Sequence, residues 1–203
     1  MEAISTEEKI KKSALREFAL NGFEGARVDR IAQKAKINKA MIYYHYKSKE
    51  NLYESVLSDV FNTIFLKLTS TLSNEKSPDE QLNLIINEYI EFIRTVDPDF
   101  MKMMMRELSS GGKYFKKLML PGIVVPMMKI VQEIISSGIK QNIFREIQPH
   151  YTFLQTLGSI IFFNAIRITL QDTDVGKSLF PDDAFDKFRM NLLGILKTGI
   201  MVH

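Results

Sequence analysis

Residues 39–46 form a short segment whose two sides differ in chemistry. At about 100° per residue of a helix, Ala40 and Tyr44 point to one side, whereas Ile42 and Tyr46 point to the other. A helix that lies in the major groove of DNA needs this division, because it packs apolar residues on its own protein and offers donors, small residues and aromatic rings to the duplex. The segment is therefore a candidate recognition helix.

Four residues of this region have side chains suited to DNA contact. Ala40 allows close approach, and the hydroxyls of Tyr43 and Tyr44 can donate to phosphate while their rings pack on thymine methyl groups. Lys49 falls in the first turn of the next helix, where free backbone N–H groups already favour an anion. A lysine there opposes the helix dipole, and contact with a phosphate would relieve that conflict.

Charge is concentrated around this segment. From Arg27 to Lys49 the chain has seven basic residues and one acidic residue, a net charge of +6, whereas all 203 residues together carry only +3. A basic segment thus belongs to a slightly acidic remainder. A basic three-helix module with a solvated face is the alternative interpretation, because lysine-rich faces are common.

Helix signals surround the candidate recognition helix and continue along the chain. Ser5 with Glu8 forms a capping box, Asn38 is a suitable N-cap for residues 39–46, and Ser48 can cap a long helix reaching Leu72. No hairpin signal and no repeat of 20–50 residues is present. We therefore predict an all-α fold of about nine helices, with three short N-terminal helices in a helix-turn-helix arrangement.

Two stretches of the second half are predicted to interrupt the helices. Pro121–Pro126 is expected to be a kink or loop, and a polar loop is expected between the last two long helices, His150–Leu170 and Ala184–Ile200. The first of these long helices is apolar on several sides, so more than one surface must cover it. Gly158 on the first of them and Gly194 and Gly199 on the second would allow the helices to approach closely in a four-helix interface between two chains. A purely intramolecular core is the alternative.

The sequence between Gly22 and Leu52 resembles the N-terminal signature of the TetR family of bacterial transcriptional regulators. The matching strings are Gly22-Phe23-Glu24-Gly25-Ala26-Arg27-Val28-Asp29-Arg30-Ile31-Ala32, Ala35-Lys36-Ile37-Asn38-Lys39-Ala40-Met41-Ile42-Tyr43-Tyr44-His45-Tyr46 and Lys49-Glu50-Asn51-Leu52. The spacing of the three strings agrees with the family's pattern without a gap. Ala26-Arg27 stands where the family has a threonine pair, and Lys36 where it has glycine.

This resemblance implies roles for individual residues. Tyr43 and Lys49 match family positions that contact phosphate, and Arg27 would replace the missing threonine hydroxyl by charge. Lys39, Met41 and Tyr44 occupy variable positions of the recognition helix and are candidates for base contact. The DNA-binding set is Arg27, Lys39, Ala40, Met41, Tyr43, Tyr44 and Lys49.

The resemblance also implies a function for the larger part of the chain. We expect a helix-turn-helix DNA-binding domain at 1–50 and a helical effector-binding and dimerisation domain at 51–203. The partners would be double-stranded DNA with a palindromic operator, a second copy of the chain bound through the last two helices, and an unknown apolar small-molecule effector that releases the repressor. Methionine and aromatic side chains adapt to apolar ligands, and the candidate pocket residues are Phe92, Met101, Met103, Met104, Met105, Phe115, Phe162 and Phe163.

Other classes of protein find little support. The chain has no cysteine, which excludes disulfides and thiolate metal sites, and three histidines without a Glu-x-x-His pair give no expected metal site, cofactor or catalytic residue. Gly176-Lys177-Ser178 lacks the first glycine of a phosphate loop, because position 171 is glutamine. An enzyme is not expected, and a helical adaptor is the second alternative. With no signal peptide and with Gly158–Ile168 too short to span a bilayer, we expect a cytoplasmic protein without membrane contact.

Overall fold

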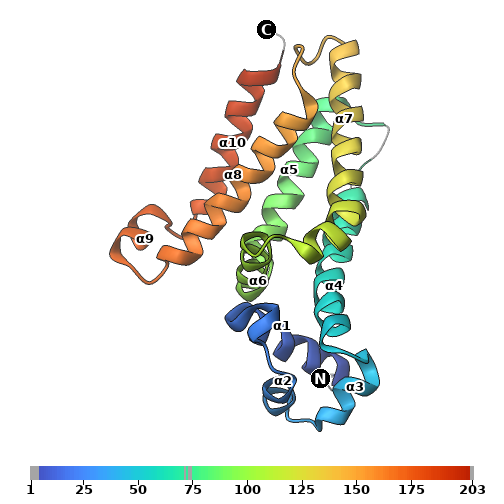
Figure 1. Cartoon of the computed structure of the whole chain (residues 1–203). Coiled ribbons are helices and arrows are strands. Elements are labelled where there is room, and N and C mark those ends of the chain that lie inside the picture. Colours follow the sequence, from blue (N-terminus) through green and yellow to red (C-terminus); the bar gives the residue numbers. More distant parts are fainter. Residues whose placement is uncertain (1–4, 71, 73–74, 202–203) are drawn as a thin grey trace. The chain divides into compact units, whose positions relative to one another are not determined.

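The computed structural model describes residues 5–70, 72 and 75–201. Over this part of the chain it contains ten α-helices, one π-helix and no β-strand (Figure 1). The all-α prediction is confirmed. The helices are α1 (Thr6–Gly25), α2 (Val28–Ala35), α3 (Lys39–Tyr46), α4 (Lys49–Ser70), α5 (Pro78–Thr95), α6 (Pro98–Ser109), the π-helix (Phe115–Val124), α7 (Val125–Lys140), α8 (Pro149–Leu170), α9 (Asp174–Leu179) and α10 (Ala184–Ile200).

The chain divides into two compact units. The first contains Met1–Thr63 and Asp97–Ile123, and the second contains Ile64–Val96 and Val124–His203. Helix α4 begins in the first unit and ends in the second. The first unit therefore combines the three N-terminal helices with α6, a segment more than thirty positions further along the chain.

In the first unit α1 is the central helix and packs against both α2 and α6. The predicted capping box starts it, since Ser5 Oγ accepts from the Glu8 N–H and the Glu8 carboxylate accepts from the Ser5 N–H. Apolar side chains at helical spacing then form the core: Ile10, Ala14, Phe18, Ile31, Ile42 and Leu52 are at most 1% exposed. Burial of these side chains holds the short helices α2 and α3, eight residues each, against α1 and α4, because helices of that length are not stable alone.

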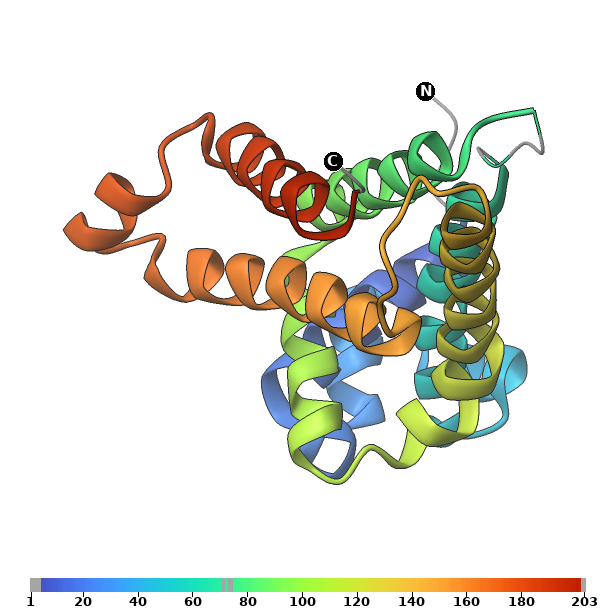
Figure 2. The same cartoon turned by 90° about the horizontal axis from the view of Figure 1, so that it is seen from above.

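In the second unit α5 packs against α7, α8 and α10, and α7 also packs against α8 (Figures 1 and 2). Helix α5 starts with a capping box of Ser77 and Glu80, with Pro78 in its first turn, where no backbone donor is needed. Its stripe Leu82, Ile85, Ile86, Ile90 and Ile93 is buried. Gly138 of α7 lies so close to Phe144 that an added Cβ would come within 2.1 Å of the ring.

Two predicted interruptions are wrong in detail. Residues 121–124 belong to the π-helix, which runs directly into α7, because Pro126 stands in the first turn of α7 and costs it no hydrogen bond. The expected loop between α8 and α10 contains α9, which the Thr173 side chain caps by accepting from the Gly176 N–H at 3.0 Å. Proline and polar composition indicated breaks at both places, but Pro121 lies inside the π-helix and residues 174–179 of the polar stretch form α9.

Candidate nucleic-acid interface

Helices α2 and α3 are joined by a tight turn. Lys36 ends α2 in the left-handed conformation, with φ 56° and ψ 47°, at a cost of about 1 kcal/mol for a residue with a side chain. Asn38 then caps α3, because its Oδ1 accepts from the Ala40 N–H at 2.8 Å. The two helices and the turn have the helix-turn-helix arrangement that the sequence predicted.

The two faces of α3 differ as the sequence suggests. Ile42 and Tyr46 are buried, and burial raises the pKa of Tyr46 to about 12. Tyr44 is 70% exposed, and Ala40 lies on the exposed side with it. Met41 and Tyr43, 38% and 42% exposed, flank them. Helix α3 therefore presents one small and aromatic surface while its opposite side is fixed in the core.

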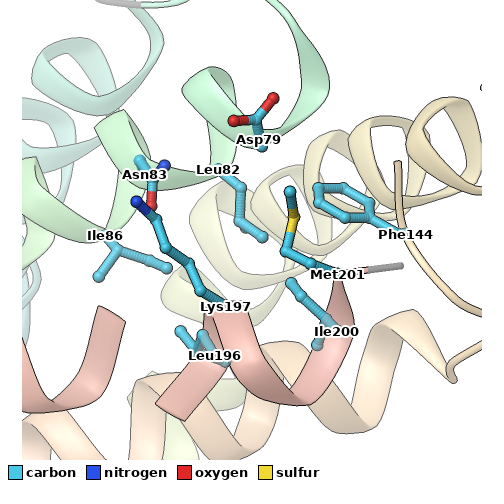
Figure 3. Close-up of a pocket in the computed structure, with 9 residues that line it drawn as sticks. All are labelled: Asp79, Leu82, Asn83, Ile86, Phe144, Leu196, Lys197, Ile200 and Met201. Carbon is cyan, nitrogen blue, oxygen red and sulfur yellow. The ribbon is translucent and has the colours of Figure 1, made fainter. Parts of the chain in front are cut away.

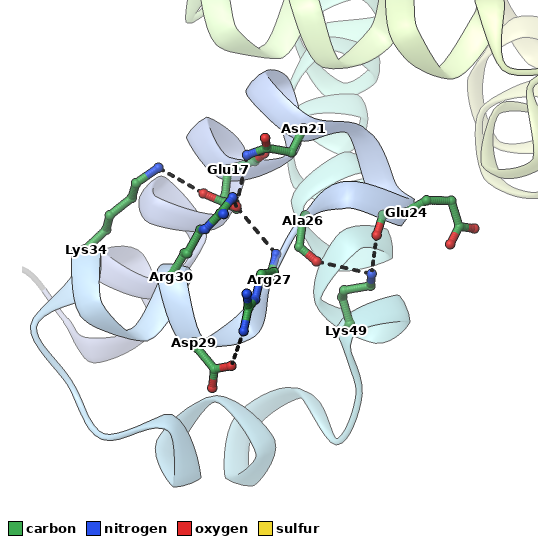
Figure 4. A network of polar contacts seen from close by, with 9 residues as sticks. All are labelled: Glu17, Asn21, Glu24, Ala26, Arg27, Asp29, Arg30, Lys34 and Lys49. Atoms are coloured by element: carbon green, nitrogen blue, oxygen red, sulfur yellow. Dashed lines mark hydrogen bonds and ion pairs between the residues drawn. The ribbon is translucent and has the colours of Figure 1, made fainter.

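A buried carboxylate ties α2 to α1. Glu17 of α1 is 1% exposed and accepts from Lys34 Nζ and Asn21 Nδ2, both at 2.9 Å (Figure 4). It also receives the Arg27 N–H at 3.4 Å and lies 3.6 Å from the Arg30 guanidinium. Burial acts to raise the pKa of Glu17, but hydrogen bonds and charges from α2 outweigh it and lower this pKa. Glu17 was not predicted from the sequence, where it looks like an ordinary surface residue of α1.

Two predicted DNA-binding cations share one carboxylate. Asp29, in the first turn of α2, lies 2.7 Å from Lys39 Nζ and 3.8 Å from the Arg27 guanidinium. The hydrogen bond from Lys39 lowers the pKa of Asp29, and the same bond raises the pKa of Lys39. All three side chains are roughly half exposed. From the sequence, Asp29 was only the one negative charge of segment 27–49, and its ion pairs with Lys39 and Arg27 were not predicted.

Lys49 already contacts the end of α1. Its Nζ donates to the carbonyl oxygens of Glu24 at 3.3 Å and Ala26 at 3.2 Å (Figure 4), and lies 4.6 Å from the centre of the Phe23 ring. These carbonyls relieve the conflict with the α4 dipole without a phosphate. Ser48, as predicted, accepts from the Asn51 N–H at 3.0 Å in the first turn of α4. An ammonium has three donors, so one remains for a further ligand.

The eight predicted effector residues are divided between the two units. Met101, Met103 and Met104 are buried in α6 of the first unit, Met105 is exposed, and the π-helix holds Phe115. The other three are in the second unit: Phe92 in α5, and Phe162 and Phe163 in α8. Phe163 stacks on Phe188 of α10 with ring centres 4.2 Å apart, whereas Phe162 is 66% exposed.

A small surface pocket of the second unit is lined by other residues. It lies between the start of α5, the end of α10 and Phe144, and none of the eight predicted residues lines it (Figure 3). Its walls are mostly apolar, and three of the nine lining side chains are polar. The lining residues are Asp79, Leu82, Asn83, Ile86, Phe144, Leu196, Lys197, Ile200 and Met201.

Helices α8 and α10 carry an unusual amount of exposed apolar surface. Tyr151, Leu154 and Phe162 of α8 and Met190 and Ile195 of α10 are between 52% and 75% exposed. Two helical stretches, 115–140 and 149–170, are long and apolar enough to cross a membrane by length and composition alone. The core helix of a soluble protein passes the same test, so this finding assigns no membrane span, and the absence of membrane contact stays a prediction. An apolar surface of this kind also suits a protein interface.

The described residues contain no cluster of three or more histidines, aspartates or glutamates that could hold a metal ion. The buried acids have other partners. Besides Glu17, Glu107 of α6 accepts from the Tyr53 hydroxyl at 3.0 Å and from the backbone N–H groups of Tyr114 at 2.6 Å and Phe115 at 3.1 Å.

Known proteins share this arrangement. Residues 10–56 match the sequence pattern of "Bacterial regulatory proteins, tetR family". The chain is similar to the HTH-type transcriptional repressor NicS of Pseudomonas putida, with 30% identity over 174 residues that cover 83% of this chain and 80% of NicS.

Solved structures have the same fold. A putative fatty acid metabolism regulator from Clostridium perfringens superposes with a TM-score of 0.75 at 24% identity, over 96% of this chain and 100% of that one. The regulator FadR of Bacillus subtilis, in complex with stearoyl-CoA, superposes with a TM-score of 0.72 at 18% identity, over 96% and 98%.

The fold and the exposed α3 surface define a helical transcriptional regulator that binds DNA through a helix-turn-helix. The chain belongs to the TetR family.

Proposed function

We propose that this chain is a homodimeric repressor that binds a palindromic operator and leaves it when an apolar small molecule binds. The exposed face of α3 carries the proposal, because its tyrosines face outward while Ile42 and Tyr46 fix the helix in the core. In this assignment residues 1–50 are the DNA-binding domain and 51–203 bind effector and partner, and the protein acts in the cytoplasm.

DNA contact is assigned by chemistry. Tyr43 and the remaining donor of Lys49 would bind phosphate, and Tyr44, Met41 and Lys39 would face base edges, with Ala40 allowing close approach. Arg27 lies at the start of α2 with its guanidinium 64% exposed, and would reach phosphate by charge.

Dimerisation is assigned to α8 and α10. Their exposed apolar residues form the surface that a second copy would cover, and a two-fold interface brings the same surface of each chain together. Two α3 helices on one palindrome combine their affinities, whereas one helix makes few base contacts. The two half-sites would lie about 10 base pairs apart or a multiple of that.

Release by an effector is supported by the composition of the larger part of the chain and by a relative. Met101, Met103, Met104 and Met105 with Phe92, Phe115, Phe162 and Phe163 supply apolar surface, and FadR of Bacillus subtilis was solved with stearoyl-CoA. An effector that binds the DNA-incompetent conformation more tightly shifts the population away from the operator. Helix α4, which belongs to both units, would connect the two events.

The test is a gel-shift titration with the DNA upstream of the chain's own gene. We expect a saturable complex that persists in excess random-sequence duplex. Stearoyl-CoA or a free long-chain fatty acid should dissociate this complex. Failure to shift the upstream DNA at low salt would reject operator binding. A complex that persists with every apolar compound tested would reject the effector class and leave operator binding intact.

A further inference from the structure

Asp29 is the acidic residue of the basic segment between Arg27 and Lys49. It lies in the first turn of α2, with its side chain 56% exposed, and its two carboxylate oxygens face two different cations. Oδ1 is 2.7 Å from Lys39 Nζ, and Oδ2 is 3.8 Å from Arg27 Nη2. Both cations are candidates for contact with DNA, so this carboxylate lies among the charges expected to meet the duplex.

The helix dipole favours a carboxylate in the first turn of α2, but it does not require that this carboxylate pair with two cations. Exposed ion pairs contribute little to stability because water screens them and long side chains lose entropy. The fixation of α2 rests instead on the buried Glu17, which reaches Lys34, Arg30 and the Arg27 N–H. The lowered pKa of Asp29 and the raised pKa of Lys39 agree with a pair that stays charged at neutral pH.

The pair has a consequence for DNA binding. Non-specific affinity comes from cations that neutralise phosphates and release counterions. A cation that a carboxylate already neutralises releases fewer of them, so Asp29 weakens the attraction of Lys39 and Arg27 for phosphate. Asp29 interferes less with contact between Lys39 and a base. The Lys39 ammonium has three N–H donors, and when Asp29 accepts from one of them, two remain for neutral acceptors such as O6 and N7 of guanine.

We propose that Asp29 is a specificity-determining residue, which competes with DNA phosphate for Lys39 and Arg27 and holds the Lys39 ammonium for a base edge. This inference rests on the proposed function. In the free protein and on random DNA the Asp29–Lys39 pair stays closed. On the operator, base acceptors bind the Lys39 donors that Asp29 leaves free. Removal of the carboxylate therefore strengthens binding to random-sequence DNA more than binding to the operator.

The experiment compares Asp29→Asn with the wild type on two labelled duplexes of equal length. One has a random sequence and the other is enriched from a random library by the wild-type protein. Glu24→Gln is the matched control, because it removes the same charge from an exposed residue of the same unit. Dissociation constants are measured by fluorescence anisotropy at salt concentrations from about 50 to 200 mM, where phosphate contacts dominate the salt dependence.

For Asp29→Asn we expect about threefold to tenfold tighter binding to the random duplex. The slope of log affinity against log salt should steepen by about one for each DNA-binding head. Operator affinity should change less, so the ratio of the two dissociation constants falls. In a Lys39→Met background the gain from Asp29→Asn should shrink, because the competition runs partly through Lys39.

The possible outcomes distinguish a failure of the Asp29 inference from a failure of the proposed function. If the wild type binds neither duplex at low salt, the proposed function fails and this inference with it. If the wild type binds but Asp29→Asn leaves the ratio unchanged or raises it, Asp29 does not determine specificity and the proposed function stands. Asp29 is likewise excluded as a specificity determinant if Glu24→Gln produces an equal shift, or if the gain is undiminished in Lys39→Met, because the effect is then one of net charge.

Discussion

The ammonium group of Lys49 bonds two carbonyl oxygens at the end of α1 and lies over the Phe23 ring. One side chain thus joins α1 to the start of α4 and keeps one of its three donors for the proposed phosphate contact. Lys49→Met should weaken binding to every duplex and flatten its salt dependence by about one unit per head. It should also lower the melting temperature, because both carbonyl contacts are lost. Anisotropy titrations and thermal denaturation measure the two effects. Unchanged affinity with lowered stability would assign Lys49 to the fold alone.

Glu17 gives a pH-dependent test of the α1–α2 contact. Its pKa in the folded protein lies below its ordinary value of 4.5, so the stabilisation is complete above about pH 4.5 and is lost as the pH falls through the lower folded value. Glu17→Gln should reduce the free energy of unfolding by about 1–3 kcal/mol at pH 7. The deficit should shrink below pH 4.5. Denaturant titrations at pH 7 and pH 3.5 measure it, and an equal deficit at both would contradict an ionised Glu17.

At the scale of elements, α6 and the π-helix are tied to the start of α4 within the first unit. Besides the three bonds of Glu107, Lys113 Nζ and the Tyr114 hydroxyl lie 3.0 and 3.1 Å from a Glu50 carboxylate oxygen, and Lys117 pairs with Glu54. These contacts explain why residues 97–123 belong to the same unit as the N-terminal helices.

Glu107→Ala should therefore destabilise the first unit. The buried Tyr53 hydroxyl and Tyr114 N–H and the partly buried Phe115 N–H would lose their acceptor, which costs about 2–4 kcal/mol in total. The matched variant Glu50→Ala removes a more exposed acceptor and should destabilise the protein less. Chemical denaturation compares them, and equal costs would show that burial of Glu107 has no special effect.

The sequence predicted the helices better than the side-chain contacts that connect them. Local rules located the capping box of Ser5, the Asn38 cap and the buried stripe through Ile42, because each depends on neighbours a few residues away. Glu17, Asp29 and Glu107 were missed as anchors, since each has at least one partner that is 10 or more positions away along the chain. The DNA-contact and effector residues remain predictions.

At the scale of the whole molecule, operator binding as proposed requires two chains. Phe162→Glu and Ile195→Glu place charges on the exposed apolar surfaces of α8 and α10, where they should break the dimer and weaken operator binding by at least about 100-fold, because avidity is lost. Leu66→Glu is the control, since Leu66 of α4 is as exposed as Phe162 at 66%. Sedimentation measures the assembly. Dimers that persist in both variants would move the interface elsewhere.

The most direct test of a paired α3 contact is a hydroxyl-radical footprint of the wild-type protein on the DNA upstream of its gene. We predict two protected segments related by two-fold symmetry, with centres about 10 base pairs apart or a multiple of that. Protection should weaken steeply as salt rises. No protection at low salt, or one asymmetric protected segment, would contradict a dimer that reads its operator with two α3 helices.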